Sequence, residues 1–281
     1  MINYEPVRIL FQLGPFNVYS WGVLHVIAFL VALFFIMREA KKKKIDEKHI
    51  YNIALIALVS ELIGSRLFYV FEHLSYFISK PLEIFFIWQG GLTSYGGFIA
   101  AILCCWLYVR KQNDISLLEI LDISAPWIVL ALAIGRIGCF LNWDDYGIQS
   151  SLPWAIQVGT DVARHPTQLY LMTADIIMFV ILLKIKNLRE WKEKFLPLKR
   201  PKIGDLELIH GKEILEKPGF IFLIFALMYS VFRFSIDFLR DYEFHALSLA
   251  LSQWLCIIIF IGSIALLLNL DKIQAKSWSF S

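Results

Sequence analysis

The sequence has few charged residues, and this scarcity argues against an ordinary soluble domain. Only 18% of its 281 residues are charged, 58% are hydrophobic, and the mean hydropathy is +0.62. A soluble domain has about 25% charged and about 45–50% apolar residues. The composition therefore indicates a membrane protein.

Cysteine and leader-like features are also scarce. The four cysteines form no Cys-x-x-Cys pair, and no histidine lies near them at metal-ligand spacing. We therefore predict no metal site and no disulfide framework. Residues 1–16 lack a cationic segment and a small-residue cleavage site, so we expect no signal peptide that is removed.

Seven apolar segments approach the roughly 20 residues that a transmembrane helix needs. They lie near 19–37, 51–71, 92–109, 122–141, 168–185, 218–238 and 251–270. The fourth is the least regular, because Asp122 and Pro126 stand near its start. We predict an all-α integral membrane protein with about seven transmembrane helices, forming a single polytopic membrane domain over residues 1–281.

The basic residues predict the orientation of this domain. With the N-terminus outside, the inside segments and the C-terminal tail carry 20 of the 27 lysines and arginines, and the outside segments carry four. Loops rich in lysine and arginine stay in the cytoplasm. We therefore expect an outside N-terminus and a cytoplasmic C-terminus.

Three connecting segments have distinct compositions. We expect residues 72–91, with their aromatic side chains, to form an interfacial helix at the outer face. Residues 142–167 form a second, small periplasmic or extracellular segment. Residues 186–217 form a charged cytoplasmic loop, with a short amphipathic helix near 188–196.

Three arginines, Arg66, Arg136 and Arg233, lie within the predicted spans. An arginine at the centre of a span costs about 2.5–3.5 kcal/mol on insertion scales, so each needs a function or a partner. All three would lie in the outer half of the bilayer, which favours one shared site for a phosphate, whose oxygens match the planar guanidinium group. Alternatively, the arginines extend to the interface or form ion pairs with Glu61 and Asp237.

Further polar residues cluster at the predicted outer ends of the spans. Arg233 and Asp237 are four residues apart on one helical face, and Arg240 follows them. The run from Gly135 to Asn142 has two glycines three residues apart, a spacing that lets a helix or a lipid approach closely.

Six motifs occur in an order that resembles the prolipoprotein diacylglyceryl transferase family over about residues 12 to 270. The motifs are residues 19–22, 64–66, 90–97, 135–142, 164–170 and 232–240. The resemblance implies transfer of a diacylglyceryl group from phosphatidylglycerol to the lipobox cysteine thiol of a preprolipoprotein, which releases glycerol 1-phosphate. It also implies a bacterial inner membrane, no nucleic acid partner and no cofactor.

The resemblance also assigns roles to individual residues. Arg136 and Arg233 match the family's functional arginines, and Asp237 matches the acidic partner. Further matching or neighbouring positions extend the expected phosphatidylglycerol site to Arg66, Asn142, Gly147, Arg240 and Trp21. The chemistry agrees with this assignment, because charge develops on a phosphate as it leaves, and fixed cations stabilise that charge.

The attacking thiol must lose its proton, and three residues are candidates to assist: Tyr95, Asp144 and His165. The sequence does not rank these three candidates. The sequence departs from the family pattern at several positions, including tyrosine for a frequent histidine at 95. The other departures are Trp21, Cys139, Trp143, Leu171 and Asp237.

Two other functions are compatible with parts of the sequence. One is a divergent relative that binds an anionic phospholipid without this transfer or with a different acceptor. The other is an unrelated transporter, although no paired broken spans are visible. A lateral opening toward lipid would favour the transferase, and a path through the membrane would favour a transporter.

Overall fold

The computed structural model describes residues 2–14, 16–87, 90–112, 114–195, 214–241, 245–246 and 248–270. These residues belong to two compact units. The first comprises Met1–Phe35 and Leu121–Ser281, and the second comprises Ile36–Ile120.

Helices dominate the described chain, and their lengths fit a membrane protein. Six helices are long and apolar enough to cross a membrane, and a seventh apolar stretch, Gly96–Arg110, is shorter. The prediction of an all-α integral membrane protein with about seven spans is confirmed. The helices are α1 (Ser20–Lys42), α2 (Glu47–Glu72), α4 (Ser94–Arg110), α5 (Leu117–Asn142), α6 (Thr167–Phe195), α8 (Phe220–Asp237) and α9 (Leu251–Leu268).

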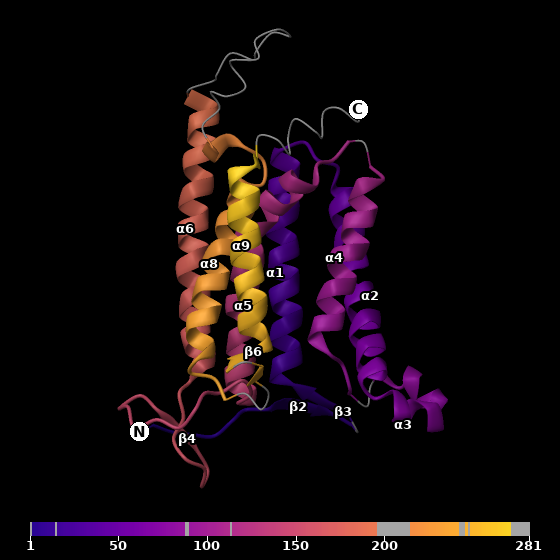
Figure 1. The fold of residues 1–281 in the computed structure, drawn as a ribbon, viewed down its shortest axis with the longest axis vertical. Helices are drawn as coiled ribbons and strands as arrows, with labels where there is room; N and C mark the ends of the chain where they lie inside the picture. Colours follow the sequence, from indigo (N-terminus) through magenta and orange to yellow (C-terminus); the bar gives the residue numbers. More distant parts are fainter. Residues whose placement is uncertain are drawn as a thin grey trace. The chain divides into compact units, whose positions relative to one another are not determined.

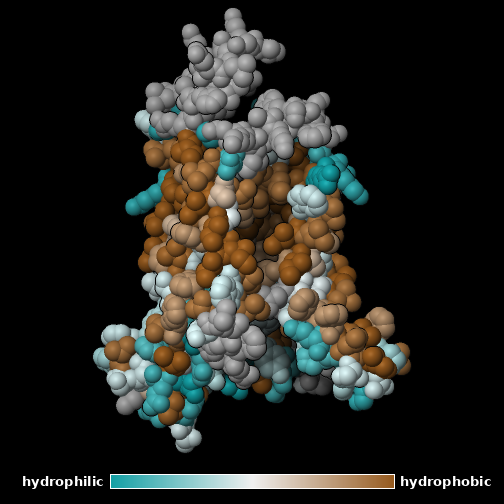
Figure 2. Space-filling view, in the orientation of Figure 1, coloured by the Kyte–Doolittle hydropathy of each residue, from teal (hydrophilic) through white to brown (hydrophobic). Residues whose placement is uncertain are grey.

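The first unit packs α5, α6, α8 and α9 lengthwise (Figure 1). Its fully buried core comes from three of these helices, with Val129 of α5, Met178 and Leu182 of α6, and Ile221 of α8. On α9, Ile258 and Ile261 are 65% and 61% exposed, as expected of side chains that face lipid. In Figure 2, hydrophobic side chains cover the middle of these helices, and hydrophilic ones gather around the β4 loop.

Asp122 does not interrupt α5, because other elements neutralise its charge. Its carboxylate accepts a hydrogen bond from Arg189 at 2.8 Å and others from the backbone amides of Gly219 and Phe222 at 2.9 and 3.0 Å. Arg189 lies on α6, which continues as one helix to Phe195. The helix expected near 188–196 is present to Phe195, but as the continuation of α6 and not as a separate element.

Short strands support the ends of the helices in the first unit. β1 (Ile2–Tyr4) pairs in parallel with β4 (Ile156–Val158), and β2 (Ile9–Leu13) forms a hairpin with β3 (Phe16–Tyr19). A third pair, β5 (His245–Ala246) with β6 (Leu249–Ala250), precedes α9. Thus β1 and β4 bind the N-terminal segment to the connection between α5 and α6.

The second unit is centred on the pair α2 and α4. A Cβ added at Gly64 would lie 2.6 Å from the Gly96 carbonyl oxygen, and one at Gly97 would lie 2.9 Å from the Glu61 carbonyl oxygen. The backbones of α2 and α4 therefore pack closely at these glycines. The 72–91 segment contains α3 (Leu74–Ser79) and the 3₁₀ helix η1 (Pro81–Phe85), and a further 3₁₀ helix, η3 (Ile214–Glu216), precedes α8 in the first unit.

Candidate active site

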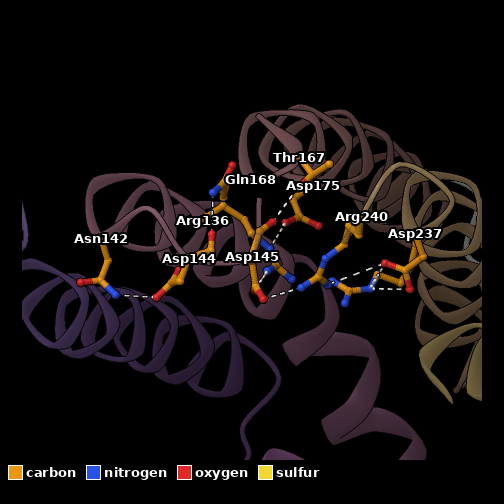
Figure 3. A network of polar contacts seen from close by, with 10 residues as sticks. Arg136, Asn142, Asp144, Asp145, Thr167, Gln168, Asp175, Asp237 and Arg240 are labelled. Carbon is orange, nitrogen blue, oxygen red and sulfur yellow. Dashed lines mark hydrogen bonds and ion pairs between the residues drawn. The ribbon is translucent and has the colours of Figure 1, made fainter. Parts of the chain in front are cut away.

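An alternating row of arginines and aspartates lies within the first unit (Figure 3). Arg233 contacts Asp237 at 3.0 Å, as the four-residue spacing on α8 predicts. Asp237 also lies 3.7 Å from Arg240, whose guanidinium contacts Asp145. We call this set, completed by Arg136 and Asp175, the ion-pair row: Arg233, Asp237, Arg240, Asp145, Arg136 and Asp175.

Arg136 stands between two carboxylates, but both contacts are long. Its Nη1 lies 3.5 Å from Asp145 Oδ2, and its Nε lies 4.0 Å from Asp175 Oδ2. The side chain is only 14% exposed. Within the described chain it donates no hydrogen bond. Arg136 is therefore a largely buried guanidinium whose donors can bind an anion.

Arg66, in the second unit, has the opposite environment. Its Nε donates to the Ile84 carbonyl at 2.9 Å, and its Nη1 donates to the Gly90 and Gly91 carbonyls at 2.7 and 3.0 Å. Its Nη2 donates to the Glu83 carbonyl. Its donors therefore hold the turn between α3 and α4.

Asp144 lies immediately beyond α5 and retains an unused acceptor. Asn142 donates to its Oδ2 at 2.6 Å, while Oδ1 is buried without a hydrogen-bond partner among the described residues. Burial, assisted by the negative charge of Asp145, raises the pKa of the Asp144 carboxyl. Gln168, fully buried at the start of α6, donates to the Asp144 backbone carbonyl and fixes this loop.

His165 belongs to a short chain of hydrogen bonds. The Tyr170 hydroxyl accepts from Trp154 Nε1 at 2.7 Å and lies 3.1 Å from His165 Nδ1. Tyr170 therefore holds the imidazole of His165 in the loop that precedes α6.

Gly147 packs closely against the segments that carry His165 and Leu239. Its amide donates to the His165 carbonyl at 2.9 Å, and it bridges to Arg240. An added Cβ would lie 2.7 Å from His165 Cβ and 2.8 Å from Thr167 Cγ2. A side chain here would displace the loop that carries Asp144 and Asp145.

The remaining predicted residues lie at different places. Trp21, on α1, is 45% exposed, and its ring lies 4.1 Å from that of His25. A Cβ added at Gly138 would lie 3.3 Å from Trp21 Cα, so α1 packs on the glycine-containing face of α5. Tyr95 lies in the first turn of α4, and its side chain falls outside the described part of the structure.

Sequence reasoning missed Asp145 and Asp175 as partners of Arg136. Glu61, considered earlier as a partner, forms no ion pair among the described residues. Asp175 interrupts an apolar segment of α6, the same signal that identified the arginines. Among the described residues, no group of three or more metal-ligating side chains is placed to hold a metal ion.

Comparison with known proteins gives a consistent result. The family model described as prolipoprotein diacylglyceryl transferase matches residues 8–201 and 203–269. A phosphatidylglycerol–prolipoprotein diacylglyceryl transferase of Pediococcus pentosaceus is 32% identical over 270 residues, covering 92% of this chain and 88% of the relative. One of Finegoldia magna is 30% identical, covering 96% of this chain and 98% of the relative.

Proposed function

This chain belongs to the prolipoprotein diacylglyceryl transferase family, and we propose that it transfers diacylglyceryl from phosphatidylglycerol to a lipobox cysteine thiol of a preprolipoprotein. The thiol sulfur attacks the glyceryl carbon that bears the phosphate. A carbon–sulfur bond forms, the carbon–oxygen bond breaks, and the electron pair leaves on glycerol 1-phosphate.

The observation that carries this proposal is the environment of Arg136. It is largely buried, and its guanidinium has only long contacts to carboxylates. A phosphodiester can replace those contacts with two parallel hydrogen bonds. As the carbon–oxygen bond breaks, negative charge grows on that phosphate, and a cation fixed in a site without much water stabilises it strongly.

Arg233 and Arg240 support this phosphate site through shared aspartates. Both contact Asp237, and Arg240 also contacts Asp145, which is the second neighbour of Arg136. In this proposal Arg233 adds positive charge and Arg240 fixes Asp145. Asn142 and Gly147 maintain the loop beyond α5, and Trp21 lines the lipid side of α1 and α5.

Asp144 is the best supported base for the thiol. Its Oδ1 is buried and accepts from no nitrogen or oxygen donor among the described residues, with the Cys139 thiol as a weak neighbour of the carboxylate, and burial raises the pKa of its carboxyl above the ordinary value. His165, held in place by Tyr170, stays a second candidate for this proton transfer. Tyr95 stays a candidate from the sequence alone, and Arg66 is proposed to shape its own segment rather than to bind the headgroup.

The distribution of basic residues supports an orientation with the N-terminus outside and the C-terminus in the cytoplasm. The ends of α5 and α8 that carry Arg136 and Arg233 then face the outer leaflet of the bacterial inner membrane. A preprolipoprotein signal peptide in that membrane brings its cysteine to the same depth. Donor lipid and acceptor thiol would thus reach the site laterally from the bilayer.

A transfer assay with a mutated acceptor tests the reaction. Purified protein in phosphatidylglycerol micelles would receive a lipobox peptide or the same peptide with its cysteine changed to serine. We expect a diacylglyceryl mass shift on the cysteine peptide only, with equimolar release of glycerol phosphate. Lipid binding without any mass shift, over several lipids and peptides, would contradict the proposal and favour a divergent lipid-binding member.

A further inference from the structure

Asp175 is the most unusual carboxylate in the first unit. It lies in α6, eight residues beyond the start of the helix at Thr167, and is 3% exposed. That position is roughly 12 Å along the helix at about 1.5 Å per residue. Its nearest charged group among the described residues is Arg136 of α5, at 4.0 Å, and the positive charge of Arg233 on α8 also acts on it.

No described residue donates a hydrogen bond to Asp175, and its Oδ2 is fully buried. Asp122, a second buried aspartate of the same unit, provides a direct comparison. It has an arginine at 2.8 Å and two backbone amides within 3.0 Å. An ionised carboxylate that is buried without donors loses the solvation energy that Asp122 recovers. The environment of Asp175 therefore favours the neutral acid.

The charges of the ion-pair row support the same conclusion. Its three guanidinium groups face three carboxylates, so a fully ionised row has no net charge with which to attract a phosphodiester. A proton on Asp175 leaves one net positive charge next to Arg136. It also provides an O–H donor directed at the same region, as protonated buried carboxylic acids provide in other enzymes.

We propose that Asp175 is a catalytic general acid that enters the reaction protonated and transfers its proton to a phosphate oxygen of the departing glycerol phosphate. This inference rests on the proposed transferase function. The thiol proton passes to Asp144, the sulfur–carbon bond forms as the carbon–oxygen bond breaks, and the electron pair goes to the phosphate oxygen. As that bond breaks, Asp175 transfers its proton to the same phosphate group, so glycerol phosphate leaves as a monoanion and not as a dianion. Proton exchange with water from Asp144 and to Asp175 restores both groups, so the net products are the thioether and protonated glycerol phosphate.

This division gives the two carboxyl groups opposite roles around Arg136. Asp144 lies on the loop beyond α5 and has an acceptor oxygen ready for the thiol proton. Asp175 lies deeper, on α6, beside the arginine proposed to hold the phosphate. Enzymes commonly separate an acid from a base by placing two carboxyl groups in different environments.

The test compares Asp175→Asn and Asp175→Glu with the wild type, by single-turnover transfer rates across pH. Asn is neutral and nearly isosteric, and its amide still donates a hydrogen bond, but it transfers no proton. We expect Asp175→Asn to retain the KM for phosphatidylglycerol and the unfolding midpoint, and to lower the transfer rate by about 100-fold or more. The alkaline limb of the wild-type rate profile should disappear in Asp175→Asn and return in Asp175→Glu.

Two results would overturn the inference. If Asp175 is ionised and only neutralises Arg136, Asp175→Asn should bind phosphatidylglycerol more tightly or unfold at a clearly lower temperature. If it has no chemical role, the rate and the alkaline limb should survive the substitution. An inactive wild type would contradict the transferase function itself, which distinguishes that failure from failure of the Asp175 assignment.

Discussion

Replacing Arg66 by alanine should destabilise the second unit rather than remove a lipid ligand. The guanidinium donates four hydrogen bonds to backbone carbonyls of residues 83–91, and Phe77 and Tyr69 lie 5.3 and 5.7 Å from it. A hydrogen bond to a charged group contributes about 1.5–3 kcal/mol. Water can hydrogen-bond to some of the carbonyls that Arg66 leaves, so we expect the free energy of unfolding to fall by about 3–5 kcal/mol in total.

The assay for this prediction is thermal unfolding in detergent, followed by transfer kinetics at a temperature where the variant is folded. With about 2–4 °C per kcal/mol for a chain of this size class, the midpoint should fall by about 10 °C. Arg66→Lys should restore little, because a lysine lacks the planar set of donors. Arg110→Ala, an exposed arginine at the end of α4 whose guanidinium lies 5.2 Å from the Trp106 ring, is the matched control and should lower the midpoint by no more than about 4 °C.

The opposite pattern would refute this reasoning. An unchanged midpoint in Arg66→Ala together with a strongly raised KM for phosphatidylglycerol would make Arg66 a headgroup ligand, as the sequence first suggested.

Three further substitutions test other parts of the structure. Because burial raises the pKa of the Asp144 carboxyl, wild-type kcat/KM should fall as the pH drops through that raised pKa. Asp144→Asn should lose this acid limb of the pH profile and lower the transfer rate by at least about 100-fold. A retained acid limb would exclude Asp144 as the base. Gly147→Ala places a Cβ against the Leu239 carbonyl and should cost about 1–3 kcal/mol in unfolding experiments; an unchanged midpoint would show that the loop relaxes freely. Arg189→Ala leaves Asp122 without its cation and should lower the free energy of unfolding by about 3–5 kcal/mol, while the KM for phosphatidylglycerol stays unchanged. A raised KM at unchanged stability would assign Arg189 to the substrate site.

The helices were predictable because their apolar segments are long, and α5 was recognisable despite Asp122 and Pro126 near its start. The end of α6 was not, because charged residues after 185 suggest an exit from the membrane, although the backbone continues as a helix to Phe195. Hydropathy locates the apolar part of a helix, whereas its end depends on tertiary contacts such as that of Arg189 with Asp122.

The arginines in the spans were recognisable because a charged side chain within a membrane span is energetically unfavourable. The pairing of Arg233 with Asp237 followed from their four-residue spacing on one helix. The environments of Arg136 and Arg66 did not follow, because both are single arginines in apolar segments. Arg66 meets carbonyls of a turn about 20 residues away in sequence, and Arg136 meets aspartates of other segments. Such long-range partners depend on the tertiary arrangement, which one sequence does not encode as a local pattern.

The most direct test of the account is transfer by Arg136→Ala at saturating phosphatidylglycerol, with Arg8→Ala as the control. Arg8 donates to the Asn142 carbonyl at 3.3 Å, so it lies near the same loop without joining the ion-pair row. We predict that Arg136→Ala loses about 100-fold or more in kcat, since it removes stabilisation of the leaving phosphate, and that Arg8→Ala stays near the wild type. A folded Arg136→Ala variant that transfers diacylglyceryl at nearly the wild-type rate would contradict the central claim.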